Sequence, residues 1–203
     1  MRRFTRGMIA TLALVSGTPL LAAQEAGPPS PEGIAQAVEC RSSPAAYAPY
    51  YEALFNDHPP GWAIPVRRNG HEGMTGLWTY RLAHPVTIFG RSVDTVSLLN
   101  TWVVIELPRA QALALVREKG MKRVPVRTDE TYYRGIDPDH GPMLGAFPDG
   151  DRAMARMSGG HFPRDEDNAT LFVGCNYLDI SETDFVEAAA GAEAMLIKDL
   201  KLK

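Results

Sequence analysis

The sequence has little cysteine and lacks the short motifs that identify the commonest catalytic and nucleotide-binding sites. Two cysteines in 203 residues exclude the disulfide-rich scaffolds of very small secreted domains. The chain contains no phosphate-binding P-loop, no dinucleotide fingerprint, no His-Glu-x-x-His pair and no Gly-x-Ser-x-Gly nucleophile elbow. No apolar run approaches the ~20 residues needed to span a bilayer. The remaining composition is typical of one globular domain.

The first 23 residues have the pattern of a secretory signal peptide. A basic start without acidic residues precedes a short apolar run over 8–15 and a small-residue exit. The alternative, an N-terminal membrane anchor, is disfavoured because the run is short and is followed by Pro19. We therefore expect a signal peptide over 1–23, a flexible Pro/Gly-rich leader over 24–33, and a periplasmic or secreted mature protein.

Removal of the signal peptide makes the protein more acidic. The full chain has 21 basic and 24 acidic residues, and the predicted signal contains Arg2, Arg3 and Arg6 but no acid. The mature chain then has 18 basic residues against 24 acidic ones, a formal net charge of −6. Such a surface gives no electrostatic reason to bind nucleic acid or anionic lipid headgroups, and we expect neither as a partner.

The two cysteines, Cys40 and Cys175, are both retained after cleavage. An even number of cysteines in an exported chain favours a disulfide. The alternatives are two buried thiols, or a catalytic or metal-binding cysteine. Neither residue belongs to a Cys-x-x-Cys pair or has a histidine at ligand spacing. We predict a Cys40–Cys175 bridge, which on the chain-entropy model contributes up to ~5 kcal/mol because it closes most of the mature chain.

Hydrophobic periodicity predicts an α+β fold. Helical spacing and capping residues mark four segments, 34–41, 45–55, 108–120 and 181–200. Short apolar or alternating runs mark strands at 77–82, 86–89, 93–98, 101–107, 123–126, 131–133 and 171–178. We expect one mostly antiparallel sheet flanked by short helices, in a single domain over 34–203 with one disulfide.

Residues 134–168 are rich in glycine and proline, and only a brief helix near 152–157 is expected there. A loop segment of this length inside one domain is usually functional or mobile. Aromatic residues on constrained loops make good binding anchors, and Phe147, Phe162 and Trp62 are the candidates. The alternative is that these rings pack back onto the core and hold the loops in place.

The same segment contains soft metal ligands. Thioethers and imidazoles together suit Cu(I), an ion that an exported protein can meet. The ordinary alternative is that methionine fills the core and histidine lies on the surface. A copper site would use His140, Met143, Met154, Met157 and His161.

A hydrolase assembled from distant residues is a further alternative. Its acid or base would come from His71, Asp139, His140, His161 or Glu166, whose spacing does not distinguish a site from turn residues. The hypothesis we favour from the sequence is an exported, non-catalytic binding protein, resembling an inhibitor or immunity factor in role. It would recognise a protein or an envelope component through 134–168, without a cofactor.

Overall fold

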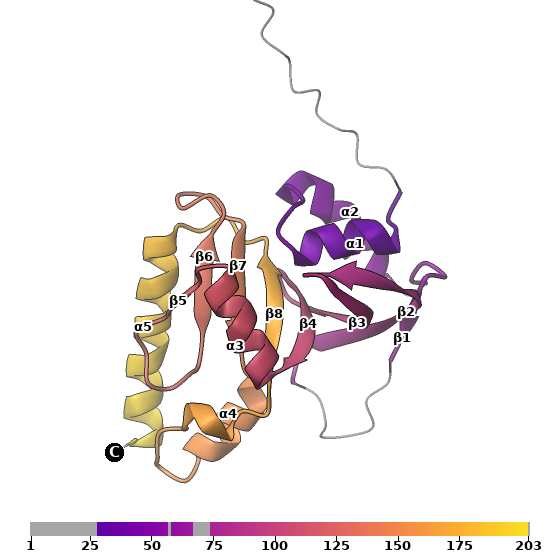
Figure 1. The fold of residues 1–203 in the computed structure, drawn as a ribbon. Coiled ribbons are helices and arrows are strands. Elements are labelled where there is room, and N and C mark those ends of the chain that lie inside the picture. Colours follow the sequence, from indigo (N-terminus) through magenta and orange to yellow (C-terminus); the bar gives the residue numbers. More distant parts are fainter. Residues whose placement is uncertain (1–27, 57, 67–73, 203) are drawn as a thin grey trace, which may run out of the picture.

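A computed structural model describes residues 28–56, 58–66 and 74–202 (Figure 1). The predicted signal peptide, most of the 24–33 leader and His71 lie outside the described residues. Helix α1 begins at Pro31, within the predicted leader, where the Ser30 hydroxyl accepts a hydrogen bond from the Gly33 amide at 3.2 Å. In the described part of the chain, no helix is both long enough and apolar enough to cross a membrane.

Eight antiparallel strands form one sheet in the order β1-β2-β3-β4-β8-β7-β6-β5, which confirms the predicted fold class. The first four strands are consecutive neighbours. They are β1 (Ala63–Pro65), β2 (Leu77–Ile88), β3 (Arg91–Leu99) and β4 (Trp102–Pro108). The other four are β5 (Lys122–Arg123), β6 (Tyr132–Gly135), β7 (Met143–Phe147) and β8 (Thr170–Asn176).

The sheet consists of two four-stranded meanders that meet in its centre. After β4 the chain crosses through helix α3 (Arg109–Glu118) to the far edge, and β5 to β8 then return strand by strand. Strand β8 pairs with β4 along its whole length, with Val103 opposite Cys175 and Leu107 opposite Leu171. The two central strands are thus distant in sequence, and their pairing joins the two halves of the domain.

One face of the sheet carries the main hydrophobic core, beneath α1 (Pro31–Val38), α2 (Pro44–Leu54) and α3. Alternate residues of the central strands point to this face, among them Ile105 and Val173. Helix α1 contributes Ile34 and Val38, and both are fully buried. Figure 1 shows α1 and α2 together over one end of the sheet and α3 over its middle.

The opposite face is covered over the second meander by α4 (Gly150–Met157) and α5 (Glu182–Leu200). Tyr133 and Met143 point to this side and pack against Phe185 of α5. Helix α5 begins as the sequence predicts, because the Ser181 hydroxyl accepts the amide hydrogen bond of Asp184 at 3.0 Å.

The structure differs from the sequence prediction in the first meander. The predicted strands 77–82 and 86–89 are one strand, β2, whose register with β3 shifts between Arg81 and Val86. Helix α2 continues through Pro49, although proline in a helix interior removes one backbone hydrogen bond.

The segment 134–168 is more ordered than its composition indicates. It contains α4 and strand β7, and all five residues of β7 are buried between β6 and β8. The sequence signal for strand β7 is the short apolar run between Pro142 and Pro148. The glycines and prolines around it led to the prediction of a loop. Deletion of this segment would therefore remove a central strand rather than only a surface loop.

The predicted disulfide is confirmed. Cys40 and Cys175 are bonded, with their Cα atoms 5.1 Å apart. Cys40 follows the end of α1 and adopts a left-handed backbone, with φ at 56°, and Cys175 lies fully buried in β8. The bridge thus attaches the first helix to the central pair of strands.

We expect the double variant Cys40→Ala/Cys175→Ala to lose about 3–5 kcal/mol of unfolding free energy, because the unfolded chain regains the freedom that the bridge removes. Urea unfolding followed by circular dichroism measures the loss. Wild-type protein in a strong reductant is the matched control and should unfold at the same urea concentration as the variant. Unchanged midpoints in both samples would contradict the stabilising role of the bridge.

Candidate functional site: an apolar pocket under helix α5

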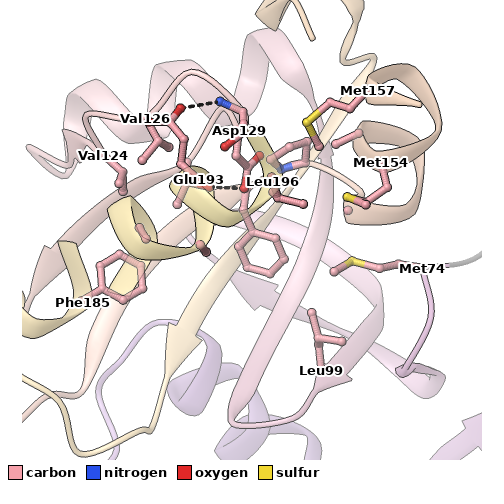
Figure 2. A pocket seen from close by; sticks show the side chains of 18 of the residues that line it. Met74, Leu99, Val124, Val126, Asp129, Met154, Met157, Phe185, Glu193 and Leu196 are labelled. Carbon is pink, nitrogen blue, oxygen red and sulfur yellow. Dashed lines mark hydrogen bonds between the residues drawn. The ribbon is translucent and has the colours of Figure 1, made fainter. Parts of the chain in front are cut away.

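A pocket of about 370 Å³ lies between the second face of the sheet, the segment 124–131 and the helices α4 and α5 (Figure 2). Figure 2 shows Met74, Met154 and Met157 on one side of the pocket and Phe185 on the other. The lining is predominantly apolar, as in most sites for small organic ligands. It consists of Met74, Leu99, Trp102, Val124, Val126, Thr128, Asp129, Thr131, Phe147, Pro148, Gly150, Ala153, Met154, Met157, Phe185, Ala189, Ala192, Glu193 and Leu196.

Two aromatic rings on the sheet line the pocket. The indole of Trp102 and the ring of Phe147 meet edge to face, with centroids 4.8 Å apart. The indole lies against Gly145 of β7, where a Cβ atom would come within 2.5 Å of it. Glycine at this position therefore lets Trp102 extend across β7, and the ring pair is part of the folded sheet rather than of a loop.

Three methionines give the pocket an adaptable side. Met157 is buried, whereas Met154 on the same helix is 42% exposed, so that this side reaches from the interior to the solvent. Met74 contributes a third thioether. Unbranched, polarisable thioether side chains change rotamer readily, which suits a wall that must fit more than one ligand shape.

Two acidic side chains line the pocket, Asp129 and Glu193 (Figure 2). Glu193 comes from α5, and its carboxylate accepts hydrogen bonds from the backbone amides of Arg127 and Thr128. It therefore ties the helix to the segment 124–131. Its hydrogen bonds give it a structural role.

Only one carboxyl oxygen of Asp129 has a side-chain hydrogen-bond partner. Its Oδ2 accepts a hydrogen bond from the Thr131 hydroxyl at 2.7 Å, whereas its buried Oδ1 has no hydrogen-bond partner. Burial is the main cause that raises the pKa of this carboxyl above its ordinary value. A buried acceptor without a partner is uncommon in folded proteins, and it marks Asp129 as a candidate ligand-binding group.

The structure places the three predicted partner-binding rings in different surroundings. Phe147 is buried in the pocket lining. Trp62 is half-buried, and its indole nitrogen donates to the Pro29 carbonyl at 2.9 Å. Phe162 is also half-buried and lies under the Arg127 guanidinium, 3.6 Å from the ring centroid. Only Phe147 thus belongs to the pocket, and partner binding by the three rings stays a prediction.

The residues of the predicted copper set are dispersed. Met154 and Met157 line the pocket, but Met143 is buried in a separate cluster beneath α5. His161 and His140 are exposed, and His140 Nδ1 lies 3.4 Å from the exposed Asp179 carboxylate. Within the described residues, no group of three or more histidine, cysteine, aspartate or glutamate side chains could hold a metal ion.

The four predicted acid and base residues that the structure describes do not lie in the pocket. Asp139, His140, His161 and Glu166 are exposed in the 134–168 segment, and none of them lines the cavity. Sequence reasoning missed Asp129, because it lies in a Thr-Asp-Glu-Thr run between two short strands and resembles any turn acid. The burial of this carboxyl depends on α4 and α5, so no local signal could have revealed it.

Comparison of the chain with protein-family models, curated proteins and solved structures found no match to any of them. The geometry of the pocket is therefore the basis for the function proposed below.

We expect Asp129→Asn to raise the unfolding free energy at pH 7 by about 1 kcal/mol, because it removes the cost of holding a buried charge. Because the folded-state pKa of Asp129 is raised, the cost of the charge is present above that pKa. The advantage of the variant should shrink as the pH falls through the raised pKa and vanish below about pH 4, where the unfolded carboxyl is also protonated.

Chemical denaturation at a series of pH values measures this effect. Asp94→Asn, at an exposed position on β3, is the control for loss of one negative charge. A destabilised Asp129→Asn at pH 7, or an advantage that grows toward acid pH, would show that the carboxylate is favourably paired in the folded protein.

Proposed function

We propose that this protein is an exported, non-catalytic binding protein that holds an apolar group of a protein or envelope component in the pocket under α5. The observation that carries the proposal is the pocket itself, an apolar cavity lined by three aromatic rings and three methionines. Its volume of about 370 Å³ falls in the ~300–1,000 Å³ range of small-ligand sites. Export is supported by the predicted signal peptide and by the disulfide.

The pocket supports the predicted role of the segment 134–168 in recognition, but only for the part of the segment that lines the cavity. Phe147, Ala153 and the two methionines of α4 all belong to that segment and form one part of the lining. The remaining lining comes from the sheet, from 124–131 and from α5. A ligand would thus contact the segment together with the rigid body of the domain, which favours a defined orientation.

Binding is favoured over catalysis by the chemistry of the lining. Among the described residues around the pocket, we find carboxyl, hydroxyl and apolar side chains but no imidazole, thiol or amine. The four titratable candidates for acid–base chemistry that the structure describes lie at the surface. An inhibitor or immunity factor would need only this kind of site, in which an apolar anchor of the partner enters a preformed cavity.

A fluorescence titration with the neutral apolar probe N-phenyl-1-naphthylamine tests the proposal. We expect the probe to bind wild-type protein with increased emission and Ala189→Leu at least tenfold more weakly, because the added side chain enters the pocket. Ala188→Leu, at an exposed position of the same helix, is the matched control and should bind as wild type does. Absence of binding to wild type, or equal binding by both variants, would overturn the proposal.

A further inference from the structure

Resting on the proposed function, we propose that the pocket selects an apolar ligand carrying a protonated amine, which pairs with the carboxyl of Asp129. The ligand class is thus an alkyl or aryl ammonium, or the amine-bearing end of a larger apolar group. The apolar part would lie against Trp102 and Phe147, and the ammonium would lie beside the 124–131 segment.

The charges of the lining favour a cation. Asp129 and Glu193 are its only charged side chains among the described residues, and both are acidic. Arg127 of this segment and Arg123 just before it have partners outside the pocket, because Arg127 stacks on Phe162 and Arg123 pairs with Asp165. An anionic ligand such as a fatty acid would therefore meet two carboxylates without a compensating cation.

The hydrogen bonds distinguish the two acids. The Glu193 carboxylate already accepts hydrogen bonds from two backbone amides. The Asp129 carboxylate accepts one from the Thr131 hydroxyl, and its buried Oδ1 has no hydrogen-bond partner. This Oδ1 has almost no accessible surface, so the Asp129 side chain must turn about its Cα–Cβ bond to bring the oxygen to the cavity that it lines. A ligand N–H can then complete the carboxyl that the empty protein leaves half-satisfied.

The electrostatic environment of Asp129 agrees with this role. Burial raises the pKa of its carboxyl, and the neighbouring carboxylate of Glu130 acts in the same direction. The Thr131 hydroxyl, the backbone amide of Glu130 and the more distant Arg123 act in the opposite direction but do not cancel the effect of burial on the pKa. Glu193 faces the same pocket from α5. A bound ammonium would favour the charged carboxylate, so ligand binding and ionisation of Asp129 support one another.

Three ligands with the same eight-carbon chain test the inference, namely n-octylamine, n-octanol and n-octanoate. Each is titrated against the wild-type complex with N-phenyl-1-naphthylamine at pH 7.5, and displacement of the probe gives its affinity. We expect octylamine to bind about tenfold more tightly than octanol, and octanoate to bind most weakly. Equal affinities for amine and alcohol, or a preference for octanoate, would overturn the inference.

The variant Asp129→Asn should remove the preference for octylamine and leave the affinity for octanol within about twofold of wild type. Asp94→Asn removes one exposed charge, so it controls for general attraction of cations to an acidic protein and should keep the preference. Retention of the preference in Asp129→Asn would overturn the assignment to this carboxyl.

Wild-type protein supplies a second measurement that does not depend on the folding of a variant. The ratio of octylamine to octanol affinity should fall toward one as the pH is lowered through the raised pKa of Asp129, because the amine stays protonated while the carboxyl becomes neutral. A ratio that stays constant down to pH 4 would contradict the inference. A third outcome is that wild-type protein binds octanol and octylamine equally and Ala189→Leu binds neither. This result would support the proposed binding pocket and contradict only the preference for an amine.

Discussion

The antiparallel pairing of β4 with β8 is the interaction on which the rest of the structure depends. It joins two meanders that are distant in sequence, and it runs from Trp102 opposite Asn176 to Pro108 opposite Thr170. The disulfide attaches α1 to one of these strands at Cys175. One face of the pair supports the main core, and the other presents Trp102 to the pocket. Loss of this pairing would therefore remove core and pocket together.

The adjacent acids Asp129 and Glu130 have different roles: Glu130 holds parts of the fold together, and Asp129 lines the pocket. Glu130 is fully buried on one side of the chain, where its carboxylate accepts hydrogen bonds from Arg109, Tyr132 and Asn168. These partners connect α3, β6 and the loop before β8. Asp129 lines the pocket instead, and its one side-chain hydrogen-bond partner is the Thr131 hydroxyl. A satisfied buried charge holds elements in register, whereas a half-satisfied one at a cavity is available to a ligand.

Much of the fold could be predicted from the sequence, because the ends of helices and the apolar runs of strands are set by residues close together in the chain. The cap at Ser181, the helix after Pro108 and the apolar run of β8 are all signals within a few residues. Strand β7 was missed because its apolar run is short and bordered by proline. The candidate site was largely missed: of the predicted residues that the structure describes, only Phe147, Met154 and Met157 line the pocket.

The sequence by itself determined most of the helices and strands, the antiparallel class and the disulfide pair. Periodicity and capping act within a few residues, and two cysteines allow only one intramolecular pair. Only the tertiary structure decided which side chains share the cavity. Trp102, Asp129 and Phe185 come from separate parts of the chain and meet because strand order and helix placement bring them to one face. Burial, and with it the raised pKa of Asp129, is a property of that assembly and not of any segment.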